Sequence, residues 1–298
     1  MVSKLITIVA GVGPGTGASV ARKFSAKYPV VLLARKPENY ESLASEINAG
    51  GGKALGISTD VSNAASLSNA VSAMKKEFGD DVGAAAAIFN ASGGFLRKPF
   101  LETAAEVFQG SLAVSAMGGI LFSQSVLPLL LKGVQQKSEH SPSLIFTGAT
   151  ASVKSNAHMS SFATGKWALR ALSQSLAREF GPQGVHVAHV IVDGVIDIPR
   201  TKEWLKDMPQ EAKLSADAVS YLFSLFFLSF FLSFFLSFFR GRRSVLLMMR
   251  WWWWWCRLRM IIGGCIRSPI PISRGRLISV RRLRSGKEED ALSMYVWR

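Results

Sequence analysis

The sequence predicts an α/β fold in which a doubly wound parallel sheet carries helices on both faces. Apolar runs of strand length alternate with segments of helical period, and the first run leads directly into a glycine-rich loop followed by a helix. The chain has 298 residues, of which 49% are hydrophobic, so it can bury the core of one large α/β domain or two small ones.

The strands and helices are expected in strict alternation over the first 200 residues. Strands are predicted at 4–10, 29–34, 53–58, 84–90, 143–148 and 185–192. Helices are predicted at 17–27, 41–48, 64–78, 104–131 and 162–180. Ligands of such sheets bind at the carboxyl ends of the strands, where the strand order reverses, so the site is expected in the loops that follow strands.

The net charge of +15 comes mainly from the C-terminal segment. Residues 240–298 hold 14 of the 35 Lys and Arg residues and three of the 20 Asp and Glu residues, so they carry +11 while residues 1–239 carry +4. No nucleic-acid partner is therefore expected for the body. Both cysteines, Cys256 and Cys265, also lie in this segment, and the start of the chain lacks signal-peptide features. We therefore expect a cytoplasmic protein without a metal site.

The composition changes abruptly after Ala218, which divides the chain into a domain at 1–218 and a low-complexity tail at 219–298. Residues 228–239 are three copies of Leu-Ser-Phe-Phe, and residues 251–255 are all tryptophan. The four-base unit CTTT read in frame encodes the first repeat and the single codon TGG the second, so the tail is predicted to be a gene-model artefact. The alternative is a membrane anchor with a basic flank, because residues 219–239 are uncharged and span about 31 Å as a helix.

The loop after the first strand has the pattern of a pyrophosphate-binding turn. It reads Ala-Gly-Val-Gly-Pro-Gly-Thr-Gly from residue 10 to residue 17. Glycines in such a loop allow a tight turn, a close approach of backbone to phosphate and close packing of the helix, whose N-terminus faces the phosphates. The predicted cofactor-binding residues here are Gly11, Gly13, Gly15, Thr16 and Gly17. The alternative is an ordinary glycine turn.

The residues after the second strand favour NADP(H) over NAD(H). An NAD site places a carboxylate here for the ribose hydroxyls, whereas this chain has Ala34 followed by the cations Arg35 and Lys36, which suit a 2′-phosphate. The alternative is a solvated basic turn.

With these residues in view, the body resembles the short-chain dehydrogenase/reductase family, which has a Rossmann-like fold, over residues 1 to about 200. The resemblance implies an adenine contact from Asp60 and Val61 and a cofactor contact from Asn90, Ala91 and Ser92 after the fourth strand. It also implies that Lys166 is the active-site lysine and that Gly194 and Ile196 lie beside the nicotinamide.

The catalytic residues of that family are mostly replaced. Phe162 stands at the position of the usual tyrosine, Ala149 at that of the serine, and Ser115 at that of the helix asparagine. A positioned acid or base contributes roughly 10²- to 10⁴-fold to the rate, so these replacements remove the usual proton donor. Thr147 and Thr150 are the predicted substitutes, with turn and cap residues as their alternative reading.

These observations predict an NADP(H)-dependent oxidoreductase that acts on a carbonyl or hydroxyl group of a small molecule. The alternative is a catalytically impaired NADP(H)-binding protein, such as a sensor or a partner-binding pseudoenzyme. A homo-oligomer is possible, as is membrane contact if residues 219–239 are genuine, while the substrate and the seventh strand of such sheets cannot be read from the sequence.

Overall fold

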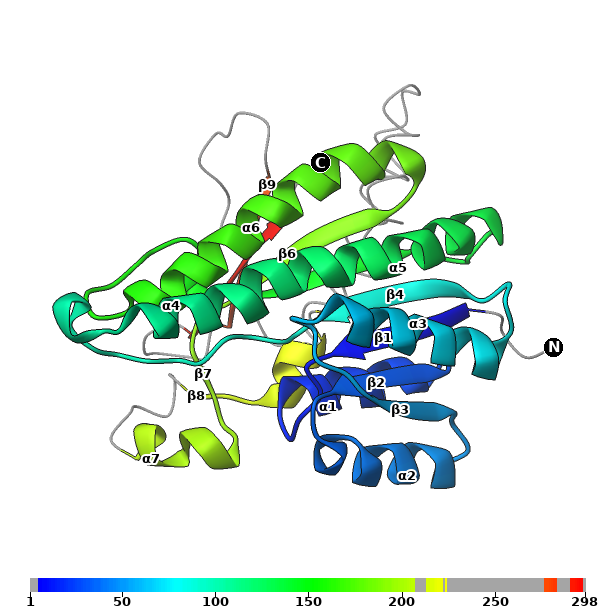
Figure 1. Ribbon diagram of the computed structural model, residues 1–298, viewed down its shortest axis with the longest axis horizontal. Coiled ribbons are helices and arrows are strands. Elements are labelled where there is room, and N and C mark those ends of the chain that lie inside the picture. The colour runs from blue at the N-terminus through cyan, green and yellow to red at the C-terminus, as the bar shows by residue number, and fades with distance from the viewer. Residues whose placement is uncertain (1–4, 207–212, 222, 224–275, 283–289, 297–298) are drawn as a thin grey trace, which may run out of the picture.

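Six parallel strands form the centre of the computed structural model, which describes residues 5–206, 213–221, 223, 276–282 and 290–296. The strands are β1 Leu5–Ala10, β2 Val30–Ala34, β3 Ala54–Ser58, β4 Gly83–Phe89, β5 Ser143–Ala149 and β6 His186–Val192. They are ordered β3-β2-β1-β4-β5-β6, so the order reverses between β1 and β4 (Figure 1). This confirms the predicted doubly wound sheet and fixes its switch point.

Helices cover both faces of the sheet. The helices are α1 Thr16–Ser25, α2 Glu41–Ala49, α3 Ala64–Phe78, α4 Ala105–Leu112, α5 Gly118–Gln135, α6 Ser160–Phe180 and the short α7 Lys202–Leu205. Buried residues of α1 and α2 pack with one face, and buried residues of α3, α5 and α6 pack with the other (Figure 1). β1 shows the cause in its sequence, because Leu5 and Val9 point to the first core and Ile6 and Ile8 to the second.

The predicted helix at 104–131 is present as one helical stretch, Ala105–Gln135, whose α-helical pattern is interrupted by a π-helical turn. α4 ends at Leu112, a π-helical turn follows at Ala113–Met117, and α5 extends to Gln135. A π-helical turn inserts one extra residue into the helical ladder, and such turns are frequent at functional sites. Periodicity alone cannot locate this insertion, because the apolar residues on either side continue the same buried face.

Packed structure continues past the predicted boundary at Ala218. Val219 and Phe223 are buried in the core beside α1, and Ser19 donates a 2.7 Å hydrogen bond to Asp217. Two further strands, β9 Arg276–Arg282 and β10 Asp290–Val296, extend the sheet in the order β6-β10-β9, with β10 antiparallel to β6 and β9 antiparallel to β10. The sequence offered no recognisable strand there. Most of the tail, including residues 224–239 and 251–255, lies outside the described residues, so its predicted origin stays a prediction.

One helical stretch among the described residues is long and apolar enough to cross a membrane. It is Ala105–Gln135, which comprises α4, the π-helical turn and α5, and half of its most apolar window is buried. α5 packs against β4 and α3 in the second core, as expected of a helix that covers a sheet.

Candidate functional site

The carboxyl end of β1 lies at the point where the strand order reverses, and the glycine loop begins there. Gly11 has a φ of +83°, and a Cβ added to it would lie 2.4 Å from the backbone nitrogen of Ala91. Only glycine fits this position, because a side chain would need both a strained backbone and space that Ala91 occupies. The loops after β1 and β4 are therefore in direct backbone contact.

The start of α1 packs closely on the same loop. A Cβ at Gly17 would lie 2.7 Å from the Gly11 carbonyl oxygen, and the Asn90 side chain donates a 2.9 Å hydrogen bond to that oxygen. Gly13, in contrast, has no atom within 4 Å of an added Cβ. Thr16 is buried, and its hydroxyl has no hydrogen-bond partner among the described residues. The helix start therefore presents an unpartnered hydroxyl beside open glycine backbone.

The segment after β6 reaches back to the glycine loop. An added Cβ at Gly15 would lie 2.7 Å from the Cγ2 atom of Ile198. The Thr201 hydroxyl donates to the Ile196 carbonyl at 2.5 Å and accepts from the Ile198 backbone N–H at 3.1 Å. The structure thus places Gly194 and Ile196, expected beside a nicotinamide, on a hydrogen-bonded segment that contacts the glycine loop.

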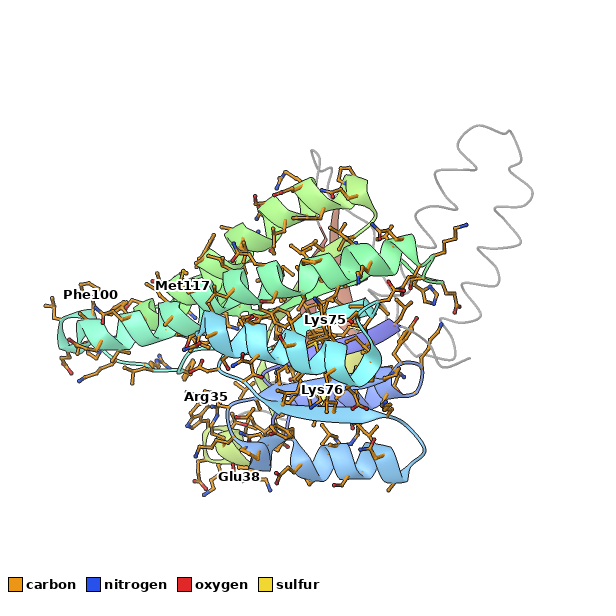
Figure 2. The ribbon with its side chains drawn as sticks, turned by 45° about the vertical axis from the view of Figure 1, so that its right-hand side comes forward. Arg35, Glu38, Lys75, Lys76, Phe100 and Met117 are labelled. Atoms are coloured by element: carbon orange, nitrogen blue, oxygen red, sulfur yellow. The ribbon has the colours of Figure 1, made fainter. Side chains whose placement is uncertain are left out.

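The end of β2 presents its cations to solvent. Ala34 is buried, whereas Arg35 and Lys36 are exposed, and Figure 2 shows Arg35 and Glu38 at the same edge of the molecule. The Ser58 hydroxyl donates a 2.9 Å hydrogen bond to the Arg35 carbonyl, which fixes the backbone but leaves the guanidinium in solvent. An exposed guanidinium at this position is chemically suited to bind an anion.

Asp60 and Val61 follow β3, and the structure gives each a partner within the protein. The Asp60 carboxylate accepts from the backbone and hydroxyl of Ser62 at 2.9 and 2.6 Å. These two hydrogen bonds, aided by the nearby Arg35 charge, hold the pKa of Asp60 below its ordinary value. Val61 is buried and contacts α5 at Gly118. Asp60 is therefore a fixed carboxylate close to Arg35.

Solvent exposure differs among the three predicted cofactor residues after β4, which are Asn90, Ala91 and Ser92. Asn90 and Ala91 are half-buried against the glycine loop, and the exposed Ser92 donates a 3.2 Å hydrogen bond to the Gly93 carbonyl. All three sit at the carboxyl end of β4, beside the switch point.

Lys166 is buried on the first turns of α6, with 3% of its surface exposed. Its ammonium group donates a 2.9 Å hydrogen bond to the Thr147 carbonyl at the end of β5. Burial lowers the pKa of Lys166 to about 8, because desolvation disfavours the charged form. A buried lysine with a lowered pKa at the carboxyl ends of strands is typical of a functional site.

His189 lies on β6 beneath α6 and faces the same helix. Its pKa is lowered to about 3 by burial and by the positive charges of Lys166 and Arg170, so its imidazole is neutral. Neither ring nitrogen has a hydrogen-bond partner among the described residues.

Phe162 lies over Lys166, with the lysine Nζ 5.7 Å from the ring centroid. The ring is half-buried and contacts Phe95 edge-on at a centroid distance of 5.3 Å. A phenyl ring has no exchangeable proton, so it contributes an apolar surface at this point.

Thr147 and Thr150 occupy different settings. Thr147 is buried, and its hydroxyl has no hydrogen-bond partner among the described residues. Thr150 is half-buried and donates a 2.5 Å hydrogen bond to the carboxylate of Asp193, which follows β6. The structure therefore pairs Thr150 with a carboxylate that sequence reasoning did not connect to it.

Ser115 lies in the π-helical turn and is 1% exposed. Its hydroxyl accepts a 3.0 Å hydrogen bond from the backbone N–H of Gly93, so it holds the loop after β4. A Cβ at Gly165 of α6 would lie 3.0 Å from the Ser115 Cβ, which brings α6 and its Lys166 close to this turn. Ser115 therefore connects the loop after β4 to the π-helical turn that lies beside α6.

These features fit a dinucleotide. The open backbone at Gly13, the unpartnered Thr16 hydroxyl, and the exposed Arg35 lie along the carboxyl edge of β1 and β2, where such a cofactor lies in this type of sheet. No group of three metal-ligating side chains occurs in the part of the chain that the structure describes.

Comparison with known sequences identifies the family. The sequence profile of the short chain dehydrogenases matches residues 5–209. The chain belongs to the short-chain dehydrogenase/reductase family. Membership covers every loop of the candidate site, from the glycine turn to the segment after β6.

Two relatives and two solved structures support the same placement. An uncharacterized oxidoreductase of Staphylococcus epidermidis is 28% identical over 224 residues, which are 74% of this chain and 91% of the relative. A 2,5-dichloro-2,5-cyclohexadiene-1,4-diol dehydrogenase of Sphingobium indicum is 30% identical over 197 residues, 66% of this chain and 74% of the relative. A short-chain dehydrogenase from Rhodopseudomonas palustris has a TM-score of 0.57 and 29% identity, covering 72% of this chain and 98% of that one. A metagenomic short-chain oxidoreductase in complex with NADP, 22% identical with a TM-score of 0.61, shares the fold over 75% of this chain and 90% of its own.

Four residues at the site were not singled out from sequence for the roles they have here. Ile198 contacts the glycine loop, Asp193 accepts a hydrogen bond from Thr150, and Phe95 contacts both Phe162 and Trp204. One signal was available, since Phe95, Asp193 and Ile198 closely follow strand ends, where ligands of this fold bind. Their mutual contacts depend on how separate loops fold back and cannot be read from the chain.

Proposed function

We propose that the chain is an NADP(H)-dependent oxidoreductase acting on a carbonyl or hydroxyl group of a small molecule in the cytoplasm. The observation that carries the proposal is the glycine loop in backbone contact with Ala91, with the Arg35 guanidinium exposed at the end of β2. Membership in a family of oxidoreductases supports it, as does the fold shared with a short-chain oxidoreductase that is in complex with NADP.

The residues that would hold NADP(H) form four groups, and each group would contact a different part of the cofactor. Gly11, Gly13, Gly15, Thr16 and Gly17 would hold the pyrophosphate, and Arg35 with Lys36 the 2′-phosphate. Asp60, Val61, Asn90, Ala91 and Ser92 would line the adenosine, and Lys166, Gly194 and Ile196 the nicotinamide ribose. Bound NADP(H) supplies or accepts the hydride that is transferred at the substrate carbon.

The protein must also handle the proton on the substrate oxygen, and Phe162 cannot. Thr150 is the best placed of the predicted substitutes, because its hydroxyl is half-buried while that of Thr147 is enclosed. Since Thr150 donates its hydrogen to Asp193, its oxygen is left as an acceptor for a substrate hydroxyl. This arrangement favours removal of a proton from an alcohol, with Asp193 as the group that receives it through Thr150.

Cofactor preference gives the first test. Titration of the protein with NADPH and NADH, followed by the fluorescence of the reduced nicotinamide, should show tighter binding of NADPH. Arg35→Ala should weaken NADPH binding about tenfold to a hundredfold, the loss of one charge-assisted contact worth roughly 1.5 to 3 kcal/mol, and leave NADH nearly unchanged.

Lys76→Ala is the matched control, because Lys76 is exposed on α3, away from Arg35 (Figure 2). It removes the same charge without touching the site. Equal affinities of the unmutated protein for the two cofactors would refute the preference, and no binding of either would refute the function.

Catalysis gives the second test and separates the enzyme from a cofactor-binding protein without activity. Phe162→Tyr restores a phenol next to Lys166 and should raise the rate of carbonyl reduction, whereas Lys166→Ala should lower it. If the unmutated protein turns over rapidly and Phe162→Tyr slows it, Thr150→Val and Asp193→Asn become the decisive variants. If neither the protein nor Phe162→Tyr reduces any carbonyl compound while NADPH binds, the non-catalytic alternative holds.

A further inference from the structure

Three aromatic side chains from three separate segments meet above Lys166. Phe95 lies in the loop after β4, Phe162 on the first turn of α6, and Trp204 on α7 after β6. The ring centroid of Phe95 is 5.3 Å from that of Phe162 and 5.2 Å from that of Trp204. We call Phe95, Phe162 and Trp204 the aromatic wall.

The aromatic wall is exposed although its rings are among the largest apolar groups in the chain. Phe95 is 42% exposed and Trp204 is 45% exposed. Phe95 meets Phe162 edge-on, with an interplanar angle of 72°, and meets Trp204 tilted at 41°. Phe95 and Trp204 thus leave part of their surface accessible to a further flat group.

Hydrogen bonds hold the two segments that carry Phe95 and Trp204. On one side of Phe95 the Gly93 N–H donates to Ser115, and on the other the Lys98 N–H donates to the His158 carbonyl at 2.8 Å. Trp204 stands between Thr201, whose hydroxyl bonds the Ile196 carbonyl, and Leu205, which is buried. The wall is therefore fixed by the fold on both sides, as expected of a preformed ligand surface.

The aromatic wall lies close to Lys166 and to the segment that contacts the glycine loop. The Lys166 Nζ lies 5.7 Å from the Phe162 centroid, and Trp204 is on the segment that contacts the glycine loop through Ile198. A substrate whose carbonyl or hydroxyl group is near Lys166 would thus have its remaining atoms along the exposed faces of Phe95 and Trp204.

We propose that the aromatic wall selects substrates with a flat, unsaturated ring attached to the reacting carbonyl or hydroxyl group. The proposal rests on the proposed function for the reaction itself and adds the class of substrate. Flat rings gain offset or edge-on contact with Phe95 and Trp204, which a puckered saturated ring of the same size cannot match. It also gives Phe162 a role in binding, since its phenyl ring completes the wall.

The test compares two ketones of the same skeleton. 2-Acetonaphthone has flat fused rings, and 2-acetyldecalin is its saturated counterpart. Dissociation constants are measured by calorimetry with the full chain, both with NADP⁺ present and without it. The flat ketone should bind about 3- to 10-fold more tightly, in keeping with the size of aromatic contacts beyond buried area. Phe95→Leu and Trp204→Leu should each reduce that ratio toward one while leaving NADPH affinity unchanged.

Phe100→Leu is the matched control. Phe100 is a 66% exposed ring at an outer end of the molecule (Figure 2), and its ring centroid lies 5.8 Å from that of Phe108, which is not part of the wall. It should keep the full preference for the flat ketone.

The outcomes separate the two proposals. Equal affinity for the two ketones, or a preference that Phe95→Leu and Trp204→Leu both preserve, overturns the inference even when NADPH binds. Failure of NADPH to bind overturns the proposed function, and the ketone titration without cofactor still decides whether the wall selects flat rings.

Discussion

At the glycine loop, backbone atoms of neighbouring segments occupy the space around the glycines. On the β5–α6 side, meaning the end of β5 and the start of α6, side-chain hydrogen bonds hold the segments in position instead. Gly11 and Gly17 are in contact with carbonyl and amide groups of neighbouring segments. Lys166 and Thr150 are each held by one polar partner. The glycine loop is fixed sterically, so it tolerates few substitutions. The β5–α6 side is held by polar pairs, so its residues can change if new pairs form. Under the assignment made from the sequence, the glycine loop matches the family's pattern, whereas on the β5–α6 side Lys166 matches it and Phe162 and Ala149 do not.

The largest effect should come from Gly11→Ala. The variant needs a positive φ and places a methyl group 2.4 Å from the Ala91 nitrogen, so we expect a loss of about 3 kcal/mol or more in the free energy of unfolding. Urea denaturation followed by circular dichroism measures it. Gly13→Ala is the control, since nothing lies within 4 Å of its added Cβ, and it should cost less than about 1 kcal/mol. Similar losses for both would show that the loop is not sterically fixed.

An intermediate effect should come from Ser115→Ala. It removes the acceptor of the buried Gly93 N–H, which costs about 1 to 3 kcal/mol. Ser111→Ala, one helical turn earlier and equally buried, removes a hydroxyl without a partner among the described residues and should be nearly neutral or stabilising. The difference between the two in urea denaturation checks the prediction. Equal effects would mean that the hydrogen bond to Gly93 does not hold the loop.

The smallest effect should come from His189→Asn, which changes how the free energy of unfolding depends on pH. Its folded pKa of about 3 is below the unfolded value near 6.5, so the unfolded chain binds the proton first and stability falls as pH drops through 6.5 toward 3. His189→Asn should remove up to about 1.4 kcal/mol per pH unit of that slope between pH 6 and 5, where few carboxylates titrate.

Unfolding free energies of the variant and of the unmutated protein at several pH values measure this slope. An unaltered slope in His189→Asn would mean that the imidazole is not kept neutral by burial.

The fold could be predicted because its causes are local. The apolar runs of β1 to β6 are buried along almost their whole length, except for the edge strand β3, and the glycine loop marks the switch point. The π-helical turn at Ser115 could not, since one inserted residue leaves the apolar pattern almost unchanged. The Thr150–Asp193 pair and the aromatic wall join residues 42 or more positions apart, and only tertiary structure brings them together.

The contact between Ile198 and Gly15 couples two parts of the candidate site. The segment that touches the glycine loop is the same one that continues into α7 and Trp204. A shift of this segment would therefore change the packing at Gly15 and the position of the Trp204 ring together.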